Sequence, residues 1–125
     1  MSQNKPIILL DPYPRTMDLL FSKENLKYLK NNFKLITAPN KNKNNFYEKN
    51  LPKADYIFGQ PNLPSSLISK STKLKAIFNV ESNFMDNMDY DYCFRKGIHV
   101  LATSPVFAQP VAEMAMGLTL SIARS

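Results

Sequence analysis

The sequence predicts an α/β fold in which one parallel sheet of five strands is covered by helices on both faces. Five short apolar runs bounded by turn residues recur over residues 1–105, and helix-like segments separate several of them. Such alternation of strands and helices is typical of a parallel sheet. The 125 residues are enough for one domain with a core of its own.

The first two elements are a buried strand and an amphipathic helix. Residues 7–10 form a continuous apolar run that residues 11–14 (DPYP) close, as in a strand buried on both faces. Residues 16–32 predict one surface helix, because apolar residues recur along one side while lysines occupy the other. The apolar residues of that side are Leu19, Leu26, Leu29 and Phe33.

The next two segments are a strand and a polar stretch. Residues 33–37 (FKLIT) predict the second strand. Residues 40–50 are rich in asparagine and lysine, and they predict a polar loop or a short irregular helix. Phe46 and Tyr47 are its candidate anchors.

Two further strands flank a short helix in the middle of the chain. Residues 54–58 (ADYIF) predict the third strand, and residues 75–80 predict the fourth. Pro64–Lys70 suits a short helix between them, since proline is favoured in a first helical turn.

A capped helix leads into the last strand. Asp89–Lys96 predicts a helix in which Asp89 is the N-cap, and Gly97 stands where a left-handed residue ends a helix. Asp86 and Asp89 bracket this turn as caps. Residues 98–102 predict the fifth strand, so that the whole arrangement is the flavodoxin-like kind of doubly wound sheet.

The last helix is apolar on every side. It is expected over Pro110–Arg124, with Pro110 at its first position and Glu113 in its first turn. Its stretch of about a dozen apolar residues suits burial in protein better than a bilayer. A helix apolar all round must be buried by a following domain or another chain. The apolar residues are Val111, Met114, Met116, Leu118, Leu120 and Ile122.

Net charge, apolar runs and cysteine content indicate which partners and which cellular compartment to expect. The net charge of +6 comes from scattered lysines without an aromatic-interleaved basic stripe, which argues against nucleic-acid binding. No early apolar run is long enough for a leader or a membrane span, so we expect no membrane association. The single cysteine, Cys93, agrees with a cytoplasmic protein.

No catalytic set or metal cluster assembles from the sequence. Ligands of such sheets bind at the carboxyl ends of strands, which selects the loops 11–15, 59–62, 80–86 and 103–109. The one histidine, His99, lies early in the fifth strand and away from those ends. Cys93 reads as a small buried hydrophobe.

The loop Val80–Phe84 is the best binding candidate. Backbone N–H groups that turn outward after a strand can hold a carboxylate without a charged side chain. An ordinary turn is the equally weighted alternative, and Glu81 opposes an anion unless its side chain points away.

Several motifs in residues 74–124 occur together, in order: LKAI, DNMD, RKGIHV, and TSP followed by PVAE and a long helix ending in IAR. In this order and spacing the stretch resembles the D-isomer-specific 2-hydroxyacid dehydrogenase family. The resemblance implies hydride transfer between a D-2-hydroxyacid and a 2-oxoacid, with NAD or NADP as cofactor. It also implies a homodimer in the full-length enzyme.

The resemblance assigns roles residue by residue. It implies that the substrate carboxylate meets backbone amides of the loop formed by Val80, Glu81, Ser82 and Asn83, although the family usually carries glycines where Glu81 and Asn83 stand. It places Val106, Phe107 and Gln109 near the nicotinamide.

The resemblance also divides the chain. Residues 1–105 would be the flavodoxin-like substrate domain, and residues 106–125 a linker and the first helix leading into an NAD-binding Rossmann domain. The dinucleotide fingerprint and the family's catalytic arginine, glutamate and histidine lie beyond Ser125, so we expect no catalytic residue in this chain and no activity from it alone.

Two other classes compete with an oxidoreductase fragment. A stand-alone flavodoxin-like binding or signalling module would want an acidic cluster or a Ser/Thr-rich phosphate loop after the first strand, where DPYP stands. A dimerisation module would use residues 111–122 as its interface.

Overall fold

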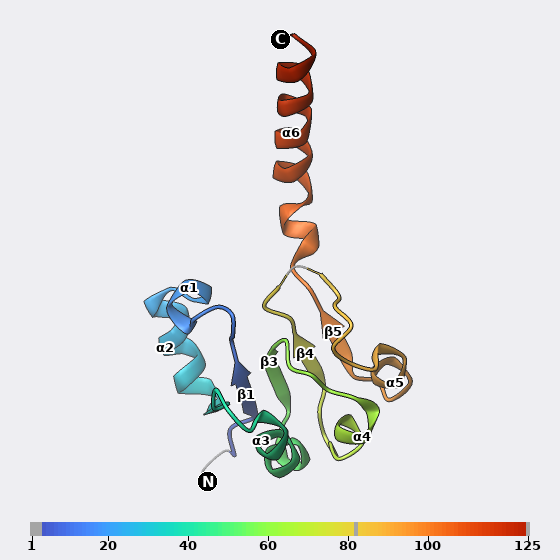
Figure 1. Ribbon diagram of the computed structural model, residues 1–125. Coiled ribbons are helices and arrows are strands. Elements are labelled where there is room, and N and C mark those ends of the chain that lie inside the picture. The colour runs from blue at the N-terminus through green and yellow to red at the C-terminus, as the bar shows by residue number, and fades with distance from the viewer. Residues whose placement is uncertain (1–3, 82, 125) are drawn as a thin grey trace.

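The computed structural model describes residues 4–81 and 83–124 and contains one five-stranded sheet (Figure 1). All strands run parallel in the order β2-β1-β3-β4-β5, so the order reverses between β1 and β3. The predicted fold class and all five strands are confirmed. The strands are β1 (Ile7–Asp11), β2 (Lys34–Thr37), β3 (Tyr56–Gly59), β4 (Ala76–Phe78) and β5 (His99–Leu101).

Within the described ranges, six α-helices and a 3-10 turn at Leu51–Lys53 connect and extend the sheet. The predicted caps of the fifth helix are confirmed: the Asp89 carboxylate accepts a hydrogen bond from the Tyr92 amide at 2.8 Å, and Gly97 has φ +72°. The helices are α1 (Met17–Leu20), α2 (Lys23–Asn32), α3 (Lys43–Asn50), α4 (Ser65–Ile68), α5 (Tyr90–Arg95) and α6 (Ser104–Ala123).

One face of the sheet carries the core. Alternate strand residues point to this face, where side chains of α3, α4 and α5 cover them in one buried cluster. Burial of this apolar area is the main force holding the layers together. The cluster includes Leu9, Ile57 and Ile77 from the strands, and Tyr47, Leu67, Ile68 and Cys93 from the helices.

The opposite face is an aromatic layer. Tyr56, Phe58 and Phe78 alternate with the core residues, and the Phe58 and Phe78 rings stack with centroids 5.9 Å apart. Phe21 reaches Phe58 and Phe33 reaches Tyr56, which attaches the α1–α2 segment to this face.

The prediction of one helix over residues 16–32 is wrong. Phe21 adopts an extended backbone between α1 and α2, and its ring contacts Phe58 at 5.0 Å. Ser22 then starts a new helix, because its hydroxyl accepts a hydrogen bond from the Asn25 amide. Leu19, which the periodicity placed on the covered side, is 75% exposed.

Residues 43–50 form the regular helix α3, anchored by Tyr47 as predicted. The Tyr47 side chain is buried, and its hydroxyl donates to Asp11 Oδ2 at 3.0 Å. Lys43 Nζ lies 2.6 Å from the other carboxylate oxygen of Asp11. These two contacts fasten α3 to the end of β1.

The last helix starts earlier than predicted. Helix α6 begins at Ser104 with Pro105 in its first turn, so Pro110 lies inside the helix and residues 104–109 are helical and not a loop or linker. Proline fits a first turn because it needs no N–H partner there, and the sequence offers two candidates. The first of them starts the helix.

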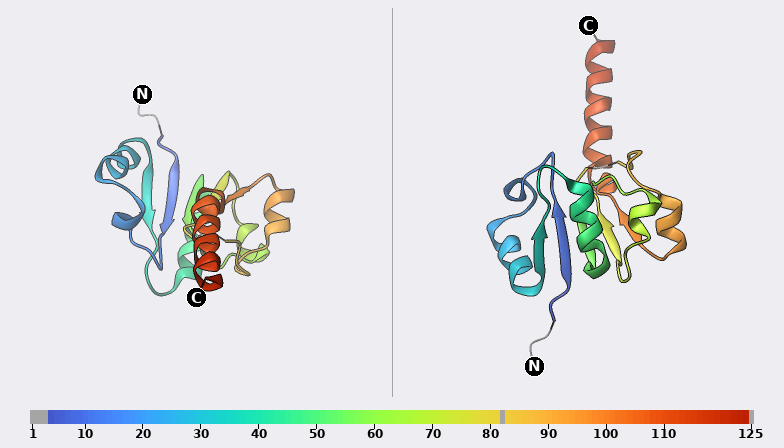
Figure 2. Two further views of the ribbon diagram at one scale, coloured as in Figure 1. Left: turned by 90° about the horizontal axis from the view of Figure 1, so that it is seen from above. Right: turned by 60° about the horizontal axis from the view of Figure 1, so that its bottom comes forward.

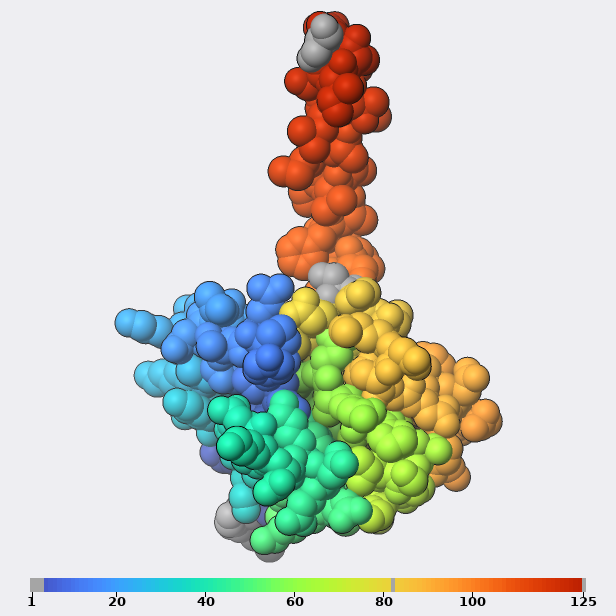
Figure 3. All heavy atoms as spheres, viewed as in Figure 1, coloured from blue at the N-terminus to red at the C-terminus, as the bar shows by residue number. Residues whose placement is uncertain are grey.

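Helix α6 stands away from the rest of the molecule (Figures 1 and 2). None of its described residues is buried. The space-filling view shows it as a stalk above the domain (Figure 3). It has 20 residues, and an 18-residue window within it has a mean hydropathy of 1.3, so it meets the length and composition of a membrane-crossing helix, unlike the shorter helix predicted.

Candidate functional site

A hollow of about 600 Å³ lies at the carboxyl ends of the strands, between the domain and the start of α6. We call it the carboxyl-edge hollow. It lies where ligands of open parallel sheets bind. Its lining residues are Arg15, Leu19, Leu20, Phe58, Asn79, Val80, Glu81, Thr103, Val106 and Phe107.

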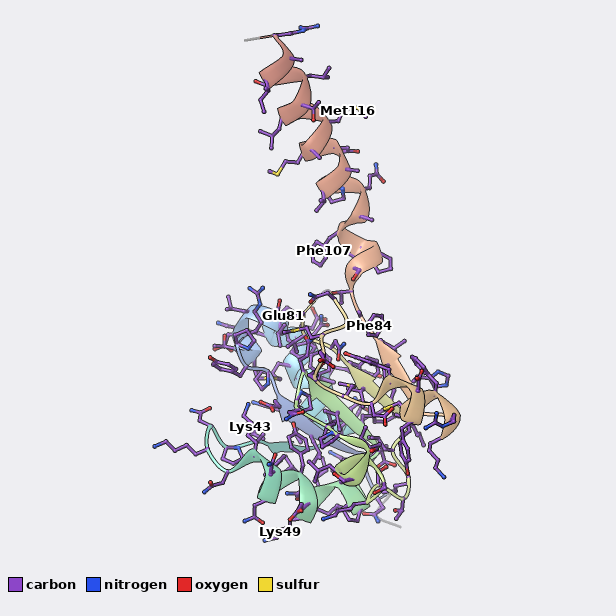
Figure 4. All side chains as sticks on the ribbon, turned by 45° about the vertical axis from the view of Figure 1, so that its right-hand side comes forward. Lys43, Lys49, Glu81, Phe84, Phe107 and Met116 are labelled. Atoms are coloured by element: carbon purple, nitrogen blue, oxygen red, sulfur yellow. The ribbon has the colours of Figure 1, made fainter. Side chains whose placement is uncertain are left out.

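The hollow brings together residues from two separate predictions. Val80 and Glu81 of the predicted substrate loop line it together with Val106 and Phe107, which were expected near a cofactor. Figure 4 shows Glu81 at the top of the domain, below Phe107 on the first turns of α6. The early start of α6 places these two α6 side chains over the loop.

The other predicted residues lie away from the hollow or outside the described ranges. Asn83 is exposed and does not line the hollow. Gln109 does not line it either, and its side-chain amide donates to Glu113 Oε1 at 2.9 Å within α6. Ser82 lies outside the described residues.

Arg15 neutralises the acidic residue of the loop. Its Nε lies 3.1 Å from Glu81 Oε1, and its second contact to Glu81 Oε2 measures 3.4 Å. The Arg15 side chain is half exposed, so the pair contributes little to stability and can open at small cost. The charge of Glu81, which was expected to oppose an anion, is thereby balanced at the rim.

Gln60 holds both ends of the loop. Its Oε1 accepts a hydrogen bond from the Glu81 amide at 3.0 Å, while its Nε2 donates to the Asn83 carbonyl at 3.1 Å. One side chain after β3 therefore binds two residues of the chain after β4, Glu81 and Asn83. The Glu81 amide, predicted to face a substrate carboxylate, is engaged by Gln60 in this structure.

Asn79 is the last residue before the loop and lines the hollow. The residue is 3% exposed, and neither its Oδ1 nor its Nδ2 has a hydrogen-bond partner among the described residues. Its backbone amide donates a hydrogen bond to the Leu101 carbonyl at 2.8 Å, which holds the Asn79 backbone beside β5. Buried amides without partners are rare in folded proteins.

The usual catalytic side chains lie away from the hollow. His99 is exposed at the start of β5, and Cys93 is buried in the core, where burial raises the pKa of its thiol. Among the described residues no group of three or more His, Cys, Asp or Glu could hold a metal ion. The hollow is therefore suited to binding and orienting a ligand, while the described residues supply no acid–base pair.

Sequence reasoning missed Arg15, Gln60 and Asn79. Arg15 and Gln60 lie in loops that the strand-end rule had selected, but nothing in the sequence shows that their side chains reach Glu81. Asn79 was assigned to the fourth strand. A polar residue closing an apolar strand, followed by a candidate binding loop, was the available signal.

Comparison with known proteins gives a family. The family model described as D-isomer specific 2-hydroxyacid dehydrogenase, catalytic domain, matches residues 15–122. A search of curated proteins finds no match.

Solved structures give the same fold. A phosphoglycerate oxidoreductase from Rhizobium etli is 39% identical with a TM-score of 0.78, covering 96% of this chain and 37% of that one. D-lactate dehydrogenase from Aquifex aeolicus, complexed with NAD and lactic acid, is 28% identical with a TM-score of 0.56, covering 92% and 33%. NAD+-bound 3-phosphoglycerate dehydrogenase from Entamoeba histolytica, 17% identical with a TM-score of 0.62, shares the fold. The chain spans little more than a third of the lengths of these structures.

Proposed function

Because the chain belongs to the D-isomer specific 2-hydroxyacid dehydrogenase family, we propose that it forms the substrate-side part of an NAD(P)-dependent oxidoreductase. The reaction would interconvert a D-2-hydroxyacid and a 2-oxoacid by hydride transfer. One observation carries the proposal: the substrate loop and the start of α6, about 25 residues apart in sequence, line one hollow at the carboxyl edge of the sheet.

The loop after β4 would hold the acid. Gln60 holds the Glu81 amide, and Arg15 balances the charge of Glu81, so an anionic ligand does not meet an unpaired carboxylate. The walls contributed by Leu20 and Phe58 are apolar and suit the carbon chain of a small hydroxyacid.

The start of α6 would meet the cofactor. Val106 is 72% exposed and Phe107 is 50% exposed, and both line the hollow, which gives an apolar surface suited to a nicotinamide ring. None of the three glycines of the chain belongs to a dinucleotide fingerprint, so these residues would contact only the nicotinamide end. When bound, that ring would accept or deliver the hydride. The similarity to the Aquifex aeolicus D-lactate dehydrogenase, whose structure is a complex with NAD and lactic acid, supports this assignment.

Acid binding is tested by nuclear magnetic resonance on the ¹⁵N-labelled chain, titrated with pyruvate and D-lactate. We expect the backbone amide signals of Val80, Glu81, Val106 and Phe107 to shift. Val106→Glu should abolish the shifts by placing a carboxylate in the hollow, whereas Val111→Glu, the same change on an exposed residue of α6 outside the hollow, should preserve them. Shifts confined to other parts of the molecule would contradict the proposal.

Activity gives an independent test. The chain mixed with NADH and pyruvate should not consume NADH at an enzymatic rate, because the described residues at the hollow include no proton-transferring pair. Enzymatic turnover by the chain alone would show that the chemistry has been misplaced.

A second candidate function is dimerisation through α6. The observation that favours it is the exposure of every large apolar side chain described on that helix. A homodimer would cover this surface, and it is compatible with the oxidoreductase proposal. Light scattering on the chain and on charged variants of α6 tests it.

A further inference from the structure

Asn79 lines the carboxyl-edge hollow, and its buried side-chain amide has no hydrogen-bond partner among the described residues. We propose that Asn79 binds the hydroxyl-bearing end of the ligand and makes the site prefer the 2-hydroxyacid to the corresponding 2-oxoacid. This inference rests on the proposed function and adds a specificity-determining residue to it.

The two charged side chains that line the hollow, Arg15 and Glu81, already have partners. The Arg15 guanidinium contacts Glu81, and the Glu81 amide donates to Gln60. A ligand can therefore satisfy Asn79 without displacing any of these contacts. Because Asn79 is 97% buried, as follows from its 3% exposure, its unmet hydrogen bonds are costly unless a ligand satisfies them.

The hydrogen-bonding groups of the Asn79 amide favour the 2-hydroxyacid over the 2-oxoacid. Asn79 offers one donor group, Nδ2–H₂, and one acceptor, Oδ1. A 2-hydroxyacid carries an O–H donor beside carboxylate acceptors, so it can satisfy both atoms. A 2-oxoacid carries only acceptors near its carboxylate, so Oδ1 would stay buried and unsatisfied.

The amide is also well placed to discriminate. The hydrogen bond from its backbone N–H to Leu101 holds Asn79 against β5, and Asn79 lines the hollow together with Val80 and Glu81, which the proposed function assigns to the carboxylate. Since the amide is neutral, it does not change the charge balance that Arg15 and Glu81 set at the rim.

The test compares redox pairs of acids on the full chain. The dissociation constants of D-lactate and pyruvate, and of D-2-hydroxybutyrate and 2-oxobutyrate, are measured by titration while the Asn79 side-chain amide signal is followed by nuclear magnetic resonance. We expect the hydroxyacid of each pair to bind at least about fivefold more tightly, as one unsatisfied buried acceptor predicts. The Asn79 amide signal should shift with the hydroxyacid.

Two variants separate a ligand contact from a structural role. In Asn79→Leu, which keeps the approximate volume but removes both polar atoms, the ratio of the two affinities should fall to about one. Asn31→Leu, the same change on an exposed residue of α2, should leave the ratio unchanged. If Asn79→Leu does not fold, the shift of the Asn79 signal in the unmodified chain still decides the matter.

The outcomes distinguish this inference from the proposed function. Equal affinities within each pair, an unmoved Asn79 signal on acid binding, or a ratio retained in Asn79→Leu would overturn the role of Asn79 alone. A shift with free nicotinamide but with neither acid would also overturn it and would indicate a carboxamide ligand. Failure of the chain to bind any of the four acids would overturn the proposed function itself.

Discussion

Asp55 is a buried carboxylate at the amino-terminal edge of the sheet. Its Oδ2 accepts hydrogen bonds from the Ile7 amide at 2.8 Å and from Lys73 Nζ at 3.0 Å, which joins the start of β1 to the segment before β4. Burial alone would raise the pKa of Asp55, but these hydrogen bonds and the charges of Lys73 and Lys75 outweigh it and hold the pKa below its usual value.

Replacing this carboxylate should destabilise the domain in a pH-dependent way. A lowered pKa means that the stabilisation is present above the unfolded-state pKa near 3.8 and is lost as the pH falls through the lower folded-state pKa. We expect Asp55→Asn to lower the free energy of unfolding by about 1.5–3 kcal/mol at neutral pH. The difference in the free energy of unfolding between Asp55→Asn and the unmodified chain should shrink below about pH 4, because Asp55 begins to protonate there in the unfolded state.

Urea unfolding at a series of pH values measures both quantities. Asp86→Asn, which makes the same change at an exposed position, serves as the control and should have a small effect. A constant difference between the unmodified chain and Asp55→Asn down to pH 2 would contradict the assigned pKa direction.

Individual residues also mark the limit of prediction from the sequence. The loop formed by Val80 and Glu81 was predictable, because it follows an apolar strand and the fold class fixes which strand ends meet. The partners of that loop were not. Arg15 and Gln60 reach it across 66 and 21 positions of sequence, and such contacts depend on the packed geometry of three strands.

At the level of elements, the end of β3 shows how closely two strands approach. Gly59 pairs with Asp11 and has φ +152°, and a Cβ atom added to it would lie 2.2 Å from the Asp11 carbonyl oxygen. The neighbour is backbone, so it cannot move aside. Gly97, at φ +72°, has no atom within 4 Å of the same added Cβ.

Replacing each of these glycines with alanine should lower the free energy of unfolding by a different amount. Gly97→Ala should lower the free energy of unfolding by about 1–2 kcal/mol, because alanine is strained in the left-handed backbone conformation of this position. Gly59→Ala should lose more than this, because the steric clash with β1 adds to the strained backbone. Chemical unfolding of the two variants side by side gives the comparison. An equal loss at both positions would mean that β1 and β3 can separate to admit the methyl group.

Element boundaries were less predictable than element types. The apolar spacing over residues 16–32 is compatible with one helix, and the contact between Phe21 and Phe58 and the Ser22 cap favour the break after α1. Pro105 and Pro110 are both acceptable first-turn prolines, so the sequence left the start of α6 open. In both cases tertiary packing or an equal alternative decided the outcome.

On the scale of the whole molecule, α6 carries an extended apolar surface that the domain does not cover. Eight large apolar side chains along it are at least half exposed. Contiguous apolar surfaces of this kind mark interaction sites or lead to association. The prediction that this helix needs a partner is consistent with the structure, in which the domain covers none of it. The eight are Val106, Phe107, Val111, Met114, Met116, Leu118, Leu120 and Ile122.

We therefore expect the chain to self-associate through α6. The double variant Met114→Glu/Leu118→Glu adds two charges four residues apart, on one side of the helix, and should shift the chain toward the monomer. Asn44→Glu/Asn45→Glu adds the same charge at exposed positions of α3 and should leave the association unchanged. Light scattering over a concentration series reports the mass. A monomeric unmodified chain, or equal association in both variants, would contradict this role of α6.

The two hydrogen bonds between Gln60 and the loop after β4 affect the affinity with which a ligand would bind. A binding loop that is mobile before it meets its ligand loses conformational entropy on binding, and this loss weakens the affinity. The loop after β4 is already tied at Glu81 and Asn83 to the end of β3, so part of that ordering is complete before any ligand arrives. Glu81 and Asn83 are in this sense preorganised for binding. Selection among small acids would then depend on how well each acid fits the hollow, more than on closure of the loop around the acid.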